Sequence, residues 1–230
     1  MPAPNPDTSD LVVAVDGPSG SGKSSVSRRV AQRLGLRYVD TGAMYRALTW
    51  WVLERGEDPA DTETVARLAR ELPLTMTNDP ADPRFRVDGT DVTGAIRETR
   101  ISAAVSAIAT NLGVREELVR RQRELAAAGG AVIEGRDITT VVAPDAPVRI
   151  LLTADEQARL ARRALEVHGR SDEAALAATK DQVVRRDADD STVASFTTAA
   201  DGVVLLDSSR MTLDETVDAV LGLVAERTAR

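Results

Sequence analysis

The chain has 230 residues, 43% of them hydrophobic and 28% charged, which suits one compact α/β domain with smaller insertions rather than two independent domains. Its net charge of −7 argues against a nucleic-acid partner, and the absence of cysteine excludes disulfides and zinc ribbons and fits a reducing cytoplasm. Residues 1–9 hold three prolines and no apolar signal-peptide core, and no apolar run is long enough to span a membrane, so we expect a disordered lead-in and a cytoplasmic protein with no membrane partner.

A glycine-rich loop follows the first apolar run. Residues 12–15 predict a buried strand, residues 24–34 predict a helix, and the segment 17–24 between them matches G-x-x-x-x-G-K-[ST] in full. In such a loop the backbone N–H groups and the helix N-terminus bind phosphates, the lysine reaches the β- and γ-phosphates, and the hydroxyl coordinates Mg²⁺. The predicted triphosphate-binding residues are Gly17, Pro18, Ser19, Gly20, Ser21, Gly22, Lys23, Ser24 and Ser25, with Ser24 as the magnesium ligand.

Other phosphate-binding classes fit this loop less well. A dinucleotide fingerprint G-x-G-x-x-G would begin at Gly20, but Ser25 stands where the third glycine is needed for close helix–strand packing. A switch GTPase would carry an Asn-Lys-x-Asp motif, which this sequence lacks. A motor ATPase usually has an apolar strand that ends in Asp-Glu, and residues 132–134 match that pattern poorly. A small-molecule kinase is therefore the favoured class.

The rest of the chain alternates between strand and helix patterns. Strands are predicted at 37–39, 131–133, 148–152 and 203–206, and helices at 44–55, 62–71, 97–128 with a break near Gly113, 155–167, 173–186 and 213–224. Five apolar strands separated by helices predict a parallel, doubly wound α/β sheet that binds ligands at the carboxyl ends of its strands. Short alternating segments within 74–93 predict a small antiparallel insert.

This pattern divides the chain into three parts. The predicted core comprises residues 10–60, 96–152 and 196–230. Residues 61–95 form an insert, and residues 153–195 form a helical lobe beside the sheet, which we call the lid.

Arginines are placed where an anionic second substrate could lie. Transfer of a phosphoryl group between two phosphates brings polyanions together, and the planar arginine fork binds phosphate oxygens bidentately. Arg46 lies on a helix after the second strand, and Arg136 follows the strand 131–133, where this fold binds ligands. Residues 159–186 carry further arginines, for which a charged surface helix is an equally good interpretation.

Together these motifs resemble bacterial cytidylate kinases from about Leu11 to the C-terminus. The segments that carry the resemblance are DGPSGSGKSS (16–25), DTGAMYR (40–46), VDGTDVTGAIR (87–97), VREELVRRQREL (114–125), EGRD (134–137) and RRDADDS (185–191). The resemblance implies a five-stranded core, an insert that binds a nucleoside monophosphate, a lid, and transfer of the γ-phosphoryl of ATP to CMP or dCMP with Mg²⁺. We expect a monomer.

The resemblance also implies roles for individual residues. CMP contacts would come from Thr41, Arg46, Ser106, Arg115, Arg136, Asp137 and Asp190. Among these, the cytosine would be read by Ser106, Arg115 and Asp137. Arg159 and Arg163 would lie near the phosphates of ATP, and the catalytic set would be Lys23, Arg136, Arg163 and Arg186.

Two positions depart from the family pattern. Thr139 replaces a glycine of the usual G-R-D-[IM]-G-T-V-V, and Val193 replaces the last arginine of the lid motif. The loss of one charge-assisted contact there would cost about 10²–10³ in rate if nothing replaced it. Within the same class, the alternative is an adenylate- or shikimate-type kinase. The Val193 departure also permits a second alternative, a regulatory nucleotide-binding protein with weak catalysis.

Overall fold

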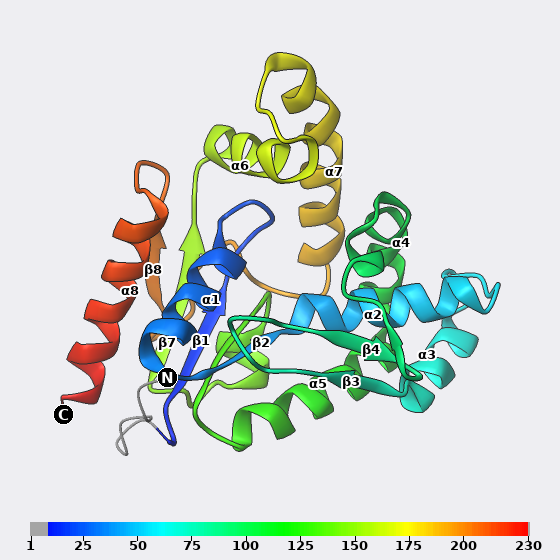
Figure 1. Ribbon diagram of the computed structural model, residues 1–230, viewed down its shortest axis with the longest axis horizontal. Coiled ribbons are helices and arrows are strands. Elements are labelled where there is room, and N and C mark those ends of the chain that lie inside the picture. Colours follow the sequence, from blue (N-terminus) through cyan, green and yellow to red (C-terminus); the bar gives the residue numbers. More distant parts are fainter. Residues whose placement is uncertain (1–8, 230) are drawn as a thin grey trace.

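A five-stranded parallel sheet forms the centre of the molecule in the computed structural model, which describes residues 9–229 (Figure 1). The strand order is β2-β6-β1-β7-β8, which confirms the predicted parallel α/β class. The strands are β1 (Val12–Asp16), β2 (Arg37–Asp40), β6 (Ala131–Gly135), β7 (Val148–Thr153) and β8 (Val204–Asp207). The expected lead-in, residues 1–9, lies outside the described residues except for Ser9.

Helices cover both faces of this sheet because alternate side chains of the central strand point in opposite directions. Val13 and Val15 pack in one apolar cluster with α1 (Lys23–Leu34) and α8 (Leu213–Thr228). Ala14 belongs to a second cluster on the opposite face, which includes residues of α5 (Leu112–Ala127). The sheet is thus doubly wound, as predicted.

Capping residues explain where the predicted helix boundaries were wrong. α2 (Thr41–Glu54) begins three residues before the predicted start, because the Asp40 carboxylate accepts a hydrogen bond from the N–H of Ala43. The break in the segment 97–128 lies at Asn111, between α4 (Thr99–Thr110) and α5, and not at Gly113. The Asn111 side chain accepts from the N–H groups of Gly113 and Val114 and so starts α5.

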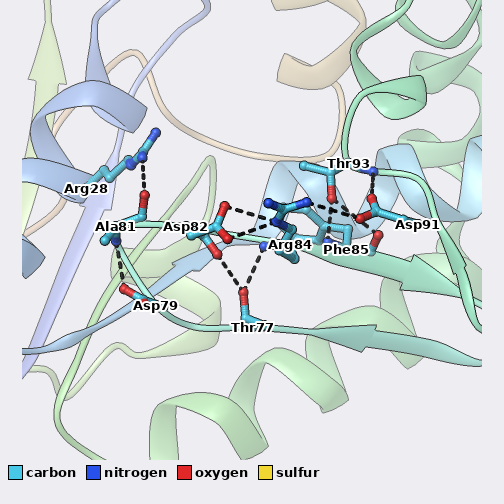
Figure 2. Close-up of polar contacts among 9 residues, drawn as sticks. All are labelled: Arg28, Thr77, Asp79, Ala81, Asp82, Arg84, Phe85, Asp91 and Thr93. Carbon is cyan, nitrogen blue, oxygen red and sulfur yellow. Dashed lines mark hydrogen bonds and ion pairs between the residues drawn. The ribbon is translucent and has the colours of Figure 1, made fainter.

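The insert contains α3 (Thr62–Glu71) and an antiparallel sheet, as the alternating segments predicted. This sheet has the order β3-β4-β5 and consists of β3 (Leu74–Met76), β4 (Phe85–Val87) and β5 (Thr90–Asp91). Figure 2 shows that the turn between β3 and β4 also contacts Arg28 of α1, which donates to the carbonyl of Ala81 at 2.8 Å. The insert is therefore tied to the helix that follows the glycine-rich loop.

Two helices of the lid stand beyond the carboxyl ends of the strands (Figure 1). They are α6 (Glu156–His168) and α7 (Glu173–Ser191), and α7 continues five residues past its predicted end at Arg186. α6 packs against α7, and α7 also reaches α4. Among residues 9–229, no helix has both the length and the apolar character of a membrane span.

Candidate active site

The glycine-rich loop lies at the carboxyl end of β1 and leads into α1. Gly22 precedes the first residue of α1 and has a φ of 88°, a left-handed backbone conformation that residues with a Cβ disfavour. Gly20 has a φ of 77°, and a Cβ there would lie 2.5 Å from the carbonyl oxygen of Arg159 on α6. Glycine at position 20 therefore lets the lid helix rest directly on the loop.

Lys23 and Ser24 face a buried carboxylate on the neighbouring strand. The Ser24 hydroxyl donates to Oε1 of Glu134 at 2.6 Å, and the Tyr38 hydroxyl donates to the same oxygen at 3.1 Å. Burial lowers the pKa of Lys23, and burial raises the pKa of the Glu134 carboxyl. The loop therefore holds a lysine and an oxygen pair in a desolvated setting, where each charge interacts strongly with a ligand.

A second buried carboxylate, Asp16, connects this loop to the segment after β6. Asp16 accepts from the N–H of Ile138 at 2.8 Å, from the N–H of Thr139 at 2.9 Å, and from the Thr139 hydroxyl at 2.6 Å. These bonds fix the start of a π-helical turn, η3 (Ile138–Val142), directly after Asp137. The threonine that replaces the family's glycine therefore adds a hydrogen bond that a glycine has no side chain to make.

Replacing Thr139 by valine is expected to lower the free energy of unfolding by about 1–2 kcal/mol near pH 8, because ionised Asp16 loses a hydrogen bond. Burial raises the pKa of Asp16 from 3.8 to about 6, so the folded protein binds a proton more readily than the unfolded chain. The contribution of Asp16 to stability therefore falls as the pH rises through this window. Because the lost bond stabilises the ionised form, the deficit of the valine variant should be smaller near pH 5.

Urea unfolding at both pH values measures this effect. Thr139→Ser is the control, because it keeps the hydroxyl and should retain most of the stability. A valine variant as stable as the wild type near pH 8, or one with the same deficit at both pH values, would contradict the role given to the hydroxyl.

Arg115 and Asp137 form an ion pair across the cleft between α5 and the end of β6. Nη2 of Arg115 donates to Oδ2 of Asp137, and both side chains are largely buried, with 15% and 7% of their surfaces exposed. Oδ1 of Asp137 has no hydrogen-bond donor among residues 9–229. The pair thus offers a carboxylate acceptor beside guanidinium donors on one wall.

Arg136 connects the core to the lid. Its Nη1 donates to Asp187 at 2.7 Å, its Nε lies 3.0 Å from Oδ2 of Asp190, and its guanidinium stacks on the Phe196 ring at 4.2 Å. Asp187 also accepts from the N–H of Ser19 at 3.0 Å and from Arg159. The end of α7 therefore lies directly against the glycine-rich loop.

Several cations are crowded together on the same cleft. Burial, together with the nearby positive charges of Arg186, Arg97 and Arg163, lowers the pKa of Arg46 to about 9. Burial and the charge of Arg136 lower the pKa of Arg186 to about 10. An anion bound among these groups would relieve their mutual repulsion.

These groups surround one cavity of about 410 Å³, within the usual range for a small-molecule site. The predicted site residues on its wall are Ser19, Gly20, Ser21, Gly22, Lys23, Ser24, Ser25, Thr41, Arg46, Arg115, Arg136, Asp137, Arg163, Arg186 and Asp190. The fold therefore brings the glycine-rich loop, the Arg115–Asp137 pair and the lid arginines to one place.

Four predicted site residues are not on the wall of this cavity: Gly17, Pro18, Ser106 and Arg159. Ser106 lies on α4 between Val105 and Ala109, which do line the cavity. Arg159 instead joins the lid to the loop, because its Nη1 donates to the carbonyl of Ser19 at 3.0 Å and to Asp187.

The sequence interpretation missed other residues of the wall. They include Asp40, Tyr45, Arg97, Glu134 and Arg162. Arg162 donates to the carbonyls of Ser21 at 3.1 Å and Ser208 at 2.6 Å, which joins the loop to the segment after β8. Glu134 and Asp40 carried a usable signal, since each is a carboxylate at the end of a core strand. The others meet only in three dimensions.

The oxygen groups at the loop suit a magnesium ion that is also held by phosphates. Among the side chains that the structure describes, no cluster of three or more histidine, cysteine, aspartate or glutamate residues could hold a metal alone. The Ser24 hydroxyl and the Glu134 carboxylate, 2.6 Å apart, are oxygen ligands of the type that Mg²⁺ prefers. Mg²⁺ commonly takes one or two such protein groups and completes its shell with phosphate oxygens and water.

Comparison with known proteins identifies relatives along nearly the whole chain. A family model described as "Cytidylate kinase" matches residues 13–226. A cytidylate kinase from Cutibacterium acnes is 50% identical over 219 residues, which are 94% of this chain and 97% of the relative. A cytidylate kinase from Corynebacterium diphtheriae is 48% identical over 96% of this chain and 98% of the relative. A cytidylate kinase from Streptomyces griseus is 46% identical over 94% of this chain and 93% of the relative.

Proposed function

The chain belongs to the cytidylate kinase family, and from that premise we propose that it transfers the γ-phosphoryl group of ATP to CMP or dCMP. The observation that carries this proposal is one cavity lined both by the glycine-rich loop and by the Arg115–Asp137 pair. The loop suits a triphosphate, and the pair suits a base with one amino donor and two acceptors. The products are ADP and CDP or dCDP.

On the ATP side, the loop from Gly17 to Ser25 binds the phosphates. Its N–H groups and the N-terminus of α1 surround the chain of phosphates, and the half-buried Lys23 ammonium contacts the β- and γ-phosphates. Arg159 holds the lid on the loop through Ser19 and Asp187, and Arg163 faces the cavity near the phosphates. These contacts exclude water from the phosphoryl group during transfer.

On the CMP side, Asp137 accepts a hydrogen bond from the cytosine N4 amino group, and Arg115 donates to N3 or O2. Ser106, on the preceding helix α4, contacts the same base. Thr41, Arg46 and Arg136 contact the phosphate end, and Asp190 contacts the ribose. An adenylate- or shikimate-type activity is less favoured, because shikimate has no amino donor and adenine has no carbonyl oxygen in the place of the cytosine O2.

The transfer is an in-line displacement. An acceptor phosphate oxygen forms the new P–O bond as the bond between the γ-phosphorus and its bridging oxygen breaks, and ADP leaves with the bond's electron pair. Lys23, Arg136, Arg163 and Arg186 place positive charge around the oxygens on which negative charge develops. No covalent enzyme intermediate is needed.

Ser24 and Glu134 would hold Mg²⁺, and the ion would supply positive charge that offsets the charge of the ATP phosphates. Replacing Glu134 by glutamine is expected to lower kcat by about 10–100-fold and to raise the Mg²⁺ concentration needed for half-maximal rate, because an anionic oxygen beside Ser24 is lost. A Mg²⁺ titration at fixed ATP and CMP measures both effects. Glu156→Gln is the control, because Glu156 is an exposed residue of α6. An unchanged Mg²⁺ requirement in the Glu134→Gln variant would show that Glu134 does not hold the ion.

The division of the chain follows from these roles. Residues 61–95 form the acceptor insert, residues 153–195 form the lid, and the remaining described segments form the core. We propose that the enzyme works as a cytoplasmic monomer, since the cavity is complete within one chain.

Phosphorus NMR of a mixture of the protein, ATP, Mg²⁺ and CMP tests the reaction itself. The proposal predicts loss of the ATP γ-resonance together with new resonances of ADP and CDP. Release of inorganic phosphate without CDP would identify an ATPase. ATP binding without any turnover would support a regulatory nucleotide-binding protein instead.

A further inference from the structure

Arg97 is an arginine of the cavity wall that the family resemblance did not assign. It is the last residue of a 3₁₀ turn, η2 (Ala95–Arg97), at the end of the insert. Half of its side-chain surface is exposed, and it lines the same cavity as Arg46, Arg163 and Arg186. It is therefore a cation that a ligand in the cavity can reach.

The Arg97 guanidinium is held in place on one side and open on the other. Its Nη2 donates to Oδ2 of Asp40 at 2.7 Å, while its Nε and Nη1 have no hydrogen-bond acceptor among residues 9–229, the side chains of residues 181 and 182 excepted. Asp40 is itself fixed, because its other oxygen accepts from the N–H of Ala43 at the start of α2. The pKa of Arg97 is raised by the charge of Asp40, so the group stays protonated.

Arg97 and Arg46 are also coupled through the backbone. Nη1 of Arg46 donates to the carbonyl of Ile96, the residue before Arg97, at 3.1 Å, and to the Ser102 hydroxyl at 3.0 Å. Ile96 is fully buried, so the turn that carries Arg97 is anchored in the core. The two guanidinium groups are close enough for the charge of Arg97 to help lower the pKa of Arg46.

The lid side of the cavity has an arginine without a hydrogen bond in the part of the chain that the structure describes, Arg186, whose Nε lies 3.7 Å from Oδ2 of Asp190. Val193 lines the wall there and carries no charge. Arg136 is engaged by Asp187 and Asp190, and Arg163 is paired with Glu166 at 2.8 Å. An anion between the insert and the core would therefore find open guanidinium donors on both sides, from Arg97 on the insert and from Arg186 on the lid.

We propose that Arg97 binds the phosphate of the acceptor nucleotide, as a second arginine beside Arg46. This inference rests on the proposed function, because it takes the acceptor to be a nucleoside monophosphate. Asp40 is the positioning residue, since it fixes one edge of the guanidinium and directs the other edge to the cavity.

Equilibrium binding of CMP and of cytidine to Arg97→Gln tests the proposal, because the two ligands differ only in the phosphate. A charge-assisted hydrogen bond to phosphate predicts that CMP binds about 10–100-fold more weakly, while the Kd for cytidine and the KM for ATP change less than about twofold. Arg97→Lys keeps the charge and should recover part of the CMP affinity. Arg100→Gln is the matched control, because this neighbour pairs with Glu98 and Glu54 and does not line the cavity.

An Arg97→Gln variant that binds CMP as tightly as the wild type would overturn the proposal. Equal weakening of CMP and cytidine would show that Arg97 only holds the insert to the core, and selective weakening of ATP would place it on the donor side. If Arg97→Gln does not fold, the ratio of CMP to cytidine affinity in Arg97→Lys decides, because the proposal requires that ratio to fall. A wild-type protein that binds cytidine and CMP equally would overturn the proposed function at its acceptor site.

Discussion

Lys23→Ala is expected to lower kcat for phosphoryl transfer from ATP to CMP by about 10³-fold, because the ammonium nearest the transferred group is lost from a buried, low-dielectric site. The variant should fold normally. Burial already lowers the pKa of Lys23, and among the described residues its ammonium donates one hydrogen bond, to the carbonyl of Pro18 at 3.4 Å, so the folded state loses little when the charge is removed. Steady-state kinetics together with thermal unfolding separate the two effects.

The matched control is Lys180→Ala, since the sequence contains only these two lysines. Lys180 is 59% exposed on α7 and lies 3.5 Å from Glu156, so its loss should leave kcat unchanged. Near-normal turnover by a folded Lys23→Ala protein would remove the lysine from the transfer step, and with it the assignment of residues 17–24 as the donor site.

Asp137→Asn should lower the ratio of kcat/KM for CMP to that for UMP by about 10²-fold. The carboxylate only accepts hydrogen bonds, which matches the cytosine amino group, whereas the asparagine amide can also donate to the uracil O4. The change also leaves Arg115 without its charged partner in a largely buried pair, so the kcat/KM for CMP itself should fall.

Asp145→Asn is the control, because Asp145 is exposed on the loop between η3 and β7. Both acceptors must be measured with each variant at saturating ATP. If Asp137→Asn reduced the rates with CMP and UMP by the same factor, Asp137 would support the fold of the cleft and would not read the base.

Local pattern explains which parts of the site could be predicted from the sequence. Residues 17–24 are contiguous, and their spacing alone specifies a strand, a turn and a helix start, so the donor site needed no tertiary information. Arg136 and Asp137 directly follow a core strand, and parallel strands end at one edge of their sheet. The five strands were found for the same reason, because each is a short apolar run between turn signals.

Contacts between distant segments explain what the sequence could not reveal. Ser24 and Glu134 are 110 positions apart and meet only because β6 pairs with β1. The N–H of Ser19 meets Asp187 across 168 positions. Arg97 stands in a short turn with no periodic pattern of its own, and its place on the cavity depends on Asp40, which caps a different element.

We propose that one cavity joins an ATP site to a cytosine-reading acceptor site. The kcat/KM of the wild-type enzyme tests this for five acceptors: CMP, dCMP, UMP, AMP and shikimate. Each rate is followed by ADP release in the presence of ATP and Mg²⁺. We expect CMP or dCMP to be preferred over UMP, AMP and shikimate by at least about 10²-fold. A preference for AMP or shikimate, or no turnover of any acceptor by a protein that binds ATP, would contradict it.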